Sequence, residues 1–199
     1  MGLGQTHACA VHATTGAVWC WGSNKYGQMG SFPNATRVYA PQQVDGLSDV
    51  VKIVAGTAHS CGLKKNGTVA CWGHNGYGQF GVGHTYLSQA PEMVLDLSGV
   101  KDLASGARHM CALSQGGDVD CWGSNDSGQV GTGAETLLYS RKQRVLGLPK
   151  AVGIVAASAH TCAWTADNVV YCWGFNHAGQ LGTGDDTPRR VPTRVLQNW

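Results

Sequence analysis

Short alternating runs of apolar and polar residues recur along the chain, and they indicate short β-strands joined by tight turns. The segment "CGLKKNGTVAC" (residues 61–71) forms a hairpin about Lys65-Asn66-Gly67 if its two cysteines face each other. Leu63 then faces Val69, on the same side as the cysteines. Trp72 points to the opposite side, so both faces of the hairpin carry apolar bulk. We therefore expect a sheet that is covered on both faces.

The same hairpin occurs four times. Each copy has a His-x-Cys motif followed by Cys-Trp-Gly, and successive Trp-Gly pairs lie 51, 50 and 51 residues apart. An apolar run precedes three copies, at residues 50–56, 100–106 and 151–157, and a Gly-x-Asn-x-x-Gly-Gln-apolar-Gly segment follows all four. An irregular segment then ends in a short strand such as Gln43-Val44 or Arg194-Val195. About four short strands per unit match one propeller blade. The repeat cores are residues 7–30, 59–81, 109–131 and 160–182.

Each hairpin turn also ends in a residue suited to a positive backbone φ angle. Gly67 and Gly117 hold this position in the second and third copies, and Asn168 holds it in the fourth. The first copy is one residue longer and offers Gly16. The four turns therefore agree on one hairpin geometry.

The eight cysteines are distributed two per copy, with none left over. The repeat pairs them as Cys9–Cys20, Cys61–Cys71, Cys111–Cys121 and Cys162–Cys172. Opposed residues of antiparallel strands lie within disulfide reach, and disulfides persist in oxidising compartments. The alternative is a zinc site, because His59, Cys61 and Cys71 share a face. Three ligands on a flat hairpin make a poor tetrahedron and no fourth ligand recurs, so we expect disulfides and no metal.

Composition narrows the classes of function. The formal net charge is +2 and only 13% of the 199 residues are charged, which argues against a strong field for nucleic acid or membranes. No apolar run is long enough to span a membrane as a helix, and the first residues lack the apolar core of a signal peptide. No G-x-S-x-G or H-E-x-x-H motif occurs, and the two glutamates, Glu92 and Glu135, have no evident carboxylate partner. We expect a non-enzymatic protein that needs no cofactor.

The ordered motifs resemble the regulator of chromosome condensation repeat family, whose units carry a similar G-x-x-H…G-x-V…W-G-x-N-x-x-G-Q-L-G pattern. The resemblance covers essentially the whole chain. It implies a propeller, commonly of seven blades, that mostly acts as a binding platform; some members exchange nucleotide on a small GTPase or dock on chromatin. A plant branch senses ultraviolet light through clustered tryptophans, but the comparable segment here, residues 106–109, has Ala107 at the tryptophan position. Cysteines at the two hairpin positions depart from the family pattern and indicate a secreted variant.

The two ends of the chain do not complete the repeat. Only six residues precede His7, with no counterpart of the run at 50–56, and Trp199 falls about where another unit would begin. We expect one all-β propeller domain over residues 1–199, with four-stranded antiparallel blades in an open arc or as part of a larger ring. The alternative is a closed four-bladed ring in which residues 191–196 add to the first blade. Unpaired strand edges recruit partners, so we expect self-association or further blades.

Residues that differ between the copies are the candidates for binding, because loops on a rigid scaffold carry recognition. The irregular segments hold tyrosine and arginine, which are enriched at binding hot spots. The candidate partner-binding residues are Arg37, Tyr39, Tyr86, Tyr139, Arg141, Lys142, Arg189 and Arg190. Residues 141–150 carry four positive charges and no negative ones, a run that either meets an acidic partner or is an ordinary solvated loop.

These observations favour a non-enzymatic protein-binding or assembly module in an extracellular or periplasmic setting. A glycan- or surface-binding propeller is the alternative. Nucleic-acid binding through the basic residues of segments 141–150 and 189–194 is a third interpretation, which the modest net charge disfavours.

Overall fold

The computed structural model describes residues 1–31 and 35–196, which form four antiparallel four-stranded sheets and, within these ranges, no helix. The first sheet contains β1 (Gly2–Leu3), β2 (His7–Val11), β3 (Val18–Ser23) and β4 (Arg37–Gln43). The second contains β5 (Val50–Ala55), β6 (His59–Lys64), β7 (Val69–Gly73) and β8 (Ser88–Met93). The third contains β9 (Val100–Ser105), β10 (His109–Ser114), β11 (Val119–Ser124) and β12 (Leu138–Arg144). The fourth contains β13 (Ala151–Ala156), β14 (His160–Thr165), β15 (Val170–Gly174) and β16 (Arg189–Arg194). The prediction of four-stranded antiparallel blades is confirmed. In the described ranges, no helix has the length and apolar character needed to cross a membrane.

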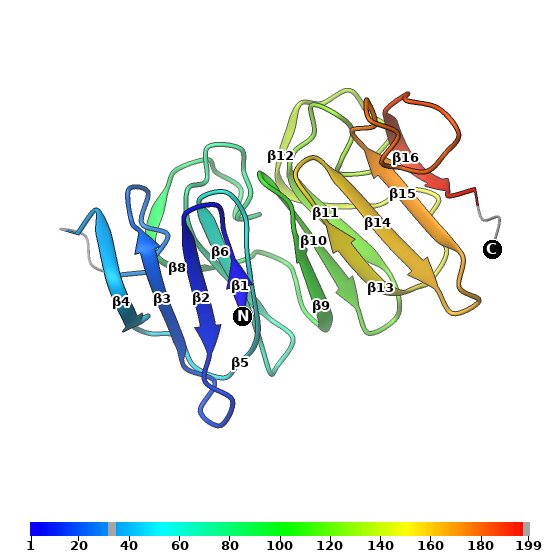
Figure 1. Cartoon of the computed structure of the whole chain (residues 1–199). Coiled ribbons are helices and arrows are strands. Elements are labelled where there is room, and N and C mark those ends of the chain that lie inside the picture. Colours follow the sequence, from blue (N-terminus) through cyan, green and yellow to red (C-terminus); the bar gives the residue numbers. More distant parts are fainter. Residues whose placement is uncertain (32–34, 197–199) are drawn as a thin grey trace.

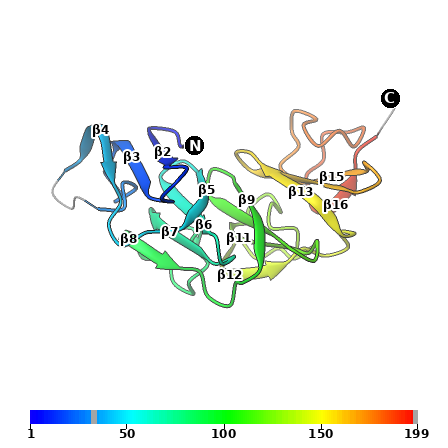
Figure 2. The ribbon, with the colours of Figure 1, turned by 90° about the horizontal axis from the view of Figure 1, so that it is seen from below.

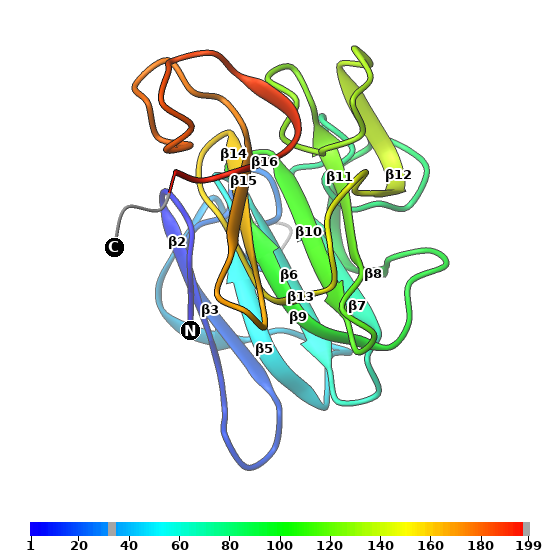
Figure 3. The ribbon, with the colours of Figure 1, turned by 90° about the vertical axis from the view of Figure 1, so that its right-hand side faces the viewer.

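The sheets follow one another along an arc, and the strands of each sheet are consecutive in sequence (Figures 1 and 2). The first strands of the sheets, β1, β5, β9 and β13, lie around a common axis, where residues from all four line one shallow cavity. The last strands, β4, β8, β12 and β16, lie on the outside. From the side of the fourth sheet, β14–β16 lie in front of the earlier sheets (Figure 3). This is how the blades of a propeller are arranged.

The alternative of a closed four-bladed ring is wrong. β16 pairs with β15, with Thr193 opposite Cys172, so it belongs to the fourth sheet. The first sheet receives its inner strand from β1, where Gly2 lies opposite Cys9. No strand pairing joins the first sheet to the fourth in the described part of the chain. Four blades therefore form an open arc, and Trp199 lies outside the described residues.

The middle hairpin of each sheet has the register that the cysteines predict. In the second sheet Cys61 lies opposite Cys71. The four expected disulfides are present, each with a Cα–Cα distance of 4.1 Å. The turn residues have the expected conformation, with φ of 78° at Gly67 and 63° at Asn168. Alternation and turn chemistry therefore determine this part of the blade.

Three apolar cores lie between successive sheets, in place of one core for the whole domain. Each core joins the disulfide-bearing face of one sheet to the tryptophan-bearing face of the next. Between the second and third sheets, Cys61, Leu63 and Val69 meet Met110 and Trp122. Radial stacking covers both faces of the interior blades, as the sequence predicts, and hydrophobic burial between the sheets holds the arc together.

The outer strands are longer than the sequence predicts. We expected short strands such as Gln43-Val44 after an irregular segment, whereas β4 has seven residues and β16 has six. Three of these strands contain a proline, namely Pro41 in β4, Pro91 in β8 and Pro192 in β16. A proline fits an edge strand, because its missing N–H need not face a partner. Register shifts between the third and fourth strands of every sheet accommodate the remaining irregularity.

Candidate functional site

Three of the repeated histidines connect neighbouring blades. Nε2 of His7 lies 2.9 Å from Ser60 Oγ, and Nε2 of His109 lies 2.9 Å from Thr161 Oγ1. The Thr161 hydroxyl donates onward to the backbone carbonyl of Gln129 at 3.2 Å, so it accepts its other hydrogen bond from the histidine. The network therefore assigns a neutral ring with its proton on Nε2. The partner of each of these two histidines is a side-chain hydroxyl of the next blade.

The third blade shows how this contact persists without a hydroxyl in the usual position. Met110 lies opposite Trp122, the position that Ser60 and Thr161 hold in their own blades. Ser105, opposite Met110 on β9, supplies the hydroxyl instead, and its Oγ lies 3.2 Å from His59 Nε2. The inter-blade hydrogen bond is thus kept by a different strand.

The histidines are not arranged for metal or acid–base chemistry. Burial lowers the pKa of His7 and His109 to about 4 and that of His59 to about 3, so all three rings are uncharged at neutral pH. The neighbouring cysteines are oxidised and offer no thiolate. Within residues 1–31 and 35–196, no group of three or more His, Cys, Asp or Glu side chains is placed to hold a metal ion.

The repeated tryptophans make a second inter-blade contact. Nε1 of Trp72, Trp122 and Trp173 donates to the backbone carbonyls of Gln28, Gln79 and Gln129 in the preceding blade, at 3.0, 2.8 and 2.9 Å. The repeated asparagines satisfy their own loops: Asn75 Oδ1, for example, accepts from the Phe80 N–H at 2.9 Å. At the interior junctions, the residues that recur in every copy therefore hold the scaffold together.

The two ends of the arc present the same repeat positions without a neighbouring blade. We define the first end face by Leu3, Trp19 and Trp21, on the outward side of the first sheet. We define the last end face by Val155, His160 and Trp164, on the outward side of the fourth sheet. The exposed fractions are 70% for Leu3, 36% for Trp19 and 53% for Val155. Both end faces therefore present apolar surface to solvent.

Seven of the eight candidate residues lie on outer strands and not in loops, which corrects the prediction. Arg37 and Tyr39 belong to β4, Tyr139, Arg141 and Lys142 to β12, and Arg189 and Arg190 to β16, whereas Tyr86 precedes β8. These residues come from four different sheets or the segments that precede their outer strands. Tyr39 and Tyr86 are 89% and 77% exposed, whereas the Tyr139 hydroxyl contacts Thr132 Oγ1 at 3.1 Å.

The four basic residues of segment 141–150 are paired within the chain. Arg141 lies 3.8 Å from Asp96, and Lys142 lies 3.6 Å from Asp120. Lys150 lies 2.6 Å from Asp118. Arg144 lies 2.8 Å from both Asp118 and Asp120. Hydrogen bonds from Lys150 and Arg144 hold the pKa of Asp118 below its usual value. The run is therefore not a free basic patch, and it gives little support to binding of nucleic acid or an acidic partner there.

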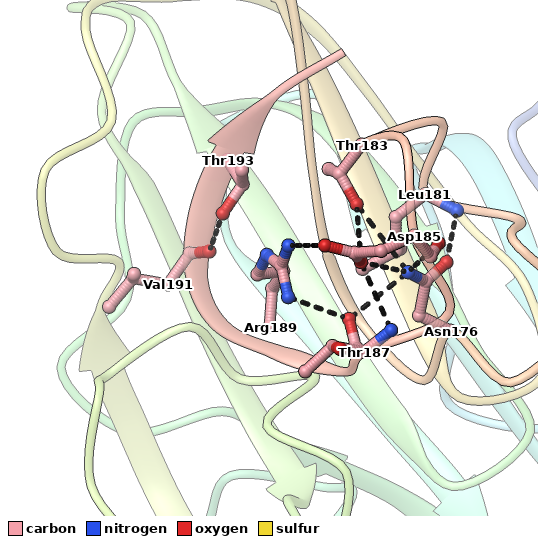
Figure 4. Close-up of polar contacts among 8 residues, drawn as sticks. All are labelled: Asn176, Leu181, Thr183, Asp185, Thr187, Arg189, Val191 and Thr193. Carbon is pink, nitrogen blue, oxygen red and sulfur yellow. Dashed lines mark hydrogen bonds and ion pairs between the residues drawn. The ribbon is translucent and has the colours of Figure 1, made fainter. Parts of the chain in front are cut away.

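Arg189 has a structural task in the fourth blade (Figure 4). Its guanidinium lies 2.5 Å from Asp185 Oδ2 and 3.0 Å from the carbonyl oxygen of Thr187. Asn176 Nδ2 donates to the carbonyls of Asp185 and Thr187 at 2.9 and 3.0 Å, and Asn176 Oδ1 accepts from the Leu181 N–H at 2.9 Å. The hydrogen bond from Arg189 lowers the pKa of Asp185. Arg189 thus ties the segment before β16 to the start of that strand, and Asn176 ties the same segment to the glycine-rich motif.

Sequence reasoning missed a cluster where β3 and β7 end and β10 begins. We call Tyr26, His74, Tyr77 and Arg108 the rim cluster. The ring centroids of Tyr26 and His74 lie 5.0 Å apart, those of His74 and Tyr77 lie 5.8 Å apart, and Cζ of Arg108 lies 4.4 Å from the Tyr77 ring centroid. The cluster lines a cavity of about 190 Å³. Its members occupy variable positions inside the repeated motifs, so comparing those positions between copies is the signal that would find them.

Known proteins match nearly the whole chain. The model of the RCC1-like domain matches residues 1–198. The probable E3 ubiquitin-protein ligase HERC6 of Homo sapiens is 35% identical over 201 residues, which cover 96% of this chain and 20% of that protein. Yeast RCC1 (Prp20), solved bound to Kap60, is similar with a TM-score of 0.87 and 25% identity over 99% of this chain and 48% of that chain. The ectodomain of the receptor kinase CR4 from Physcomitrella patens has a TM-score of 0.54 and 25% identity over 87% of this chain and 40% of that chain.

The chain spans about a fifth of the length of the ligase relative and about half of the solved yeast propeller. The activity of those longer proteins therefore does not follow from the match. What this chain shares with them is the propeller, and propeller domains of this type typically bind proteins. The repeat motifs, the radial blades and the match over residues 1–198 agree, and the chain belongs to the RCC1-like domain family.

Proposed function

We propose that this chain is a non-enzymatic protein-binding and assembly module, whose end faces accept a further sheet of the same repeat type. The contrast between interior junctions and end faces carries this proposal. At each of the three interior junctions a histidine contacts a hydroxyl and a tryptophan contacts a glutamine carbonyl. The end faces keep Trp21 and His160 in the same repeat positions, partly exposed and with no blade against them in the described residues.

The first sheet also has room for an additional strand segment. β1 pairs with two residues of β2, whereas β5 pairs with five residues of β6. A groove of about 550 Å³ lies nearby, lined by Val11, Val50 and Ile53 among others. An unpaired strand edge beside apolar side chains suits an extended segment that adds to the sheet.

A second copy in head-to-tail orientation would restore only part of an interior junction. Trp21 would face the carbonyl of Gln180, as the interior tryptophans face their glutamines. His160 would face Ala8 and Leu3. Ala8 holds the repeat position of Ser60 and Thr161, and Leu3 holds that of Ser105, but neither side chain has a hydroxyl to accept the hydrogen bond. Additional repeats with a serine or threonine at either position therefore fit the last end face better than a copy of this chain does.

We further propose an oxidising compartment, extracellular or periplasmic. All eight cysteines form disulfides and none is free. Such pairs persist outside the reducing cytosol. The similarity to a receptor-kinase ectodomain supports this proposal.

Strand β4 and the segment before β8 offer a second place for a partner. Arg37, Tyr39 and Tyr86 have exposed side chains with no carboxylate partner in the described residues. The other five candidates are held within the chain by carboxylates, by Thr132 or by backbone oxygens. We propose that the three exposed residues contribute more to binding than the five that are held.

Sedimentation velocity of the oxidised chain over a wide concentration range tests assembly through the end faces. We expect association that rises with concentration and that Trp19→Glu and Val155→Glu each suppress, because a buried unpaired charge opposes apolar contact. Leu137→Glu, at an exposed apolar residue that lies before β12 and on neither end face, is the matched control and should change little. A monomer at every concentration, identical in all variants, would contradict assembly by a second copy.

A further inference from the structure

The rim cluster has the features of a binding site that the scaffold does not require. Tyr26 follows β3, His74 and Tyr77 follow β7, and Arg108 precedes β10, so three blades contribute to one cavity of about 190 Å³. The backbone beneath is fixed across blades, because the Thr57 N–H donates to the Ala107 carbonyl at 3.1 Å. The cavity is therefore formed by variable side chains on a rigid base.

The charge of Arg108 is not neutralised within the chain. The basic residues of the third outer strand have carboxylate partners, whereas Arg108 and Lys25 form no ion pair in residues 1–31 and 35–196. Asp126 lines the adjoining cavity with Arg108, but its Oδ1 accepts from Gln129 Nε2 at 2.8 Å. Arg108 instead lies over the Tyr77 ring, an arrangement that orients the guanidinium.

His74 adds an uncharged donor beside this guanidinium. Gln79 Nε2 donates to its Nδ1 at 3.1 Å, so the neutral ring carries its proton on Nε2. Burial and then the charge of Arg108 lower the pKa of His74, which keeps the ring neutral. Nε2–H has no acceptor in the described residues.

Gly76 leaves space for the His74 ring. A Cβ at position 76 would lie 2.8 Å from His74 Cε1, so a larger residue would displace the imidazole. The other copies have Lys25, Asp126 and His177 at this position, which shows that the loop backbone itself does not require glycine. This glycine is thus matched to the histidine of its own copy.

We propose that the rim cluster binds the carboxylate of an acidic side chain in a protein partner. Arg108 and the Nε2–H of His74 donate to the carboxylate oxygens, and the rings of Tyr26 and Tyr77 pack against the methylene groups of the same side chain. Lys25, 5.5 Å from the Tyr26 ring centroid, adds positive charge at the edge of the site. About 190 Å³ accommodates one side chain and not a nucleotide or an oligosaccharide. This inference rests on the proposed protein-binding function and names the partner chemistry.

Fluorescence anisotropy with a fluorescein-labelled hexaglutamate peptide tests the site on the oxidised, full chain. We expect saturable binding that Arg108→Ala weakens by about tenfold or more, the loss typical of a hydrogen bond to a charged group. Arg108→Lys keeps the charge but loses the planar fork, so its loss should be intermediate. Arg194→Ala removes an exposed arginine of β16 that forms no ion pair in the part of the chain that the structure describes, and it should leave affinity unchanged. Far-ultraviolet circular dichroism confirms that each variant is folded.

Equal weakening by Arg108→Ala and Arg194→Ala would overturn the site, because it would show only general attraction between opposite charges. Absence of saturable binding, or equal binding of hexaglutamine, would overturn it too. Displacement of the peptide by free glutamate at equal carboxylate concentration would overturn the assignment to a protein side chain. Association through the end faces is measured separately on Arg108→Ala, so failure of the rim cluster and failure of the assembly proposal are distinguishable.

Discussion

The interior junctions and the end faces of this arc are made from the same repeat positions, yet they differ in what covers them. Trp122 is fully buried at an interior junction and donates to the Gln79 carbonyl, whereas Trp21 is only partly buried on the first end face. The interior junctions are thus covered by apolar contact, and their histidine Nε2 and tryptophan Nε1 atoms are hydrogen-bonded across the blades. We attribute the stability of the arc to the junctions, and the open ends are where we propose that further repeats bind.

The last end face carries a tryptophan that partly covers it. Trp164 stands where the second and third blades have Leu63 and Leu113. Its ring lies over Gly153, where a Cβ would come within 1.9 Å of the indole. A flat side chain over a glycine covers part of the fourth sheet. The first end face has no such cover, and Leu3 remains 70% exposed.

Removing a tryptophan from each region should give the largest difference. Trp122→Ala leaves a large cavity between the second and third sheets, and we expect a loss of about 3–5 kcal/mol in unfolding free energy. Trp21→Ala should cost much less, because its ring is only partly buried. Urea denaturation followed by circular dichroism measures both. Equal losses would contradict the contrast between junction and end face.

The disulfides should differ in their resistance to reduction. Cys61–Cys71 is completely buried at a junction, whereas Cys162 is partly exposed on the last end face. Replacing either pair by alanine removes about 3 kcal/mol in the loop-closure model, and the interior pair also loses packing. Under dithiothreitol, alkylation and mass spectrometry should therefore find Cys162–Cys172 open first. Earlier opening of Cys61–Cys71 would contradict this order.

Acid should destabilise the junctions through their histidines. His7, His59 and His109 have pKa values of about 4, 3 and 4 in the folded chain, below the ordinary value of 6.5. The unfolded chain therefore binds more protons across this window, so stability that is complete above pH 6.5 is lost as the pH falls toward about 4. Each histidine contributes a slope of at most about 1.4 kcal/mol per pH unit. Urea denaturation at about pH 7.5 and about pH 5 should show a smaller pH dependence in His109→Gln than in the unchanged chain. His160→Gln, at the last end face, should change the slope less.

The outer strands should give the smallest effect. Lys142 is partly exposed and lies 3.6 Å from Asp120, a buried carboxylate that also accepts from Arg144 Nε at 2.8 Å. Because Arg144 remains as a partner, we expect the Lys142 pair to contribute less than about 1 kcal/mol. Lys142→Ala should therefore shift the denaturation midpoint only slightly, and added salt should reduce the shift further. A loss comparable to that of Trp122→Ala would show that the outer strands, and not the junctions, govern stability.

Local patterns predicted the hairpins, because alternation, the facing cysteines and the turn residues act within about a dozen residues of one another. The disulfide register and the positive φ at Asn168 follow from them. The length of the outer strands was not predicted, because a proline in sequence indicates an irregular segment. An edge strand nevertheless accepts a proline, since one side of it has no partner strand. The hydrogen-bond partners of the interior histidines could be identified only from the structure, because they come from distant parts of the sequence. His59 and Ser105 are 46 residues apart, and nothing local shows that β9 supplies the missing hydroxyl.

The candidate site was less predictable for a related reason. Arg141 and Lys142 form a basic run in sequence, but the carboxylates that neutralise them come from other segments of the chain. Tyr77 and Arg108 are 31 positions apart and acquire a common role only when adjacent blades meet. The run of positive charge at residues 141–150 therefore predicted a basic surface that carboxylates from other segments neutralise. The rim cluster was not predicted, because its residues lie inside the repeated motifs.

Hydroxyl-radical footprinting of the tryptophans in the oxidised, dilute chain tests the central contrast most directly. Open end faces predict rapid oxidation of Trp19 and Trp21 and strong protection of Trp72, Trp122 and Trp173, which are fully buried. Protection of Trp21 equal to that of Trp122 would mean that the first end face is already covered, and it would contradict the account.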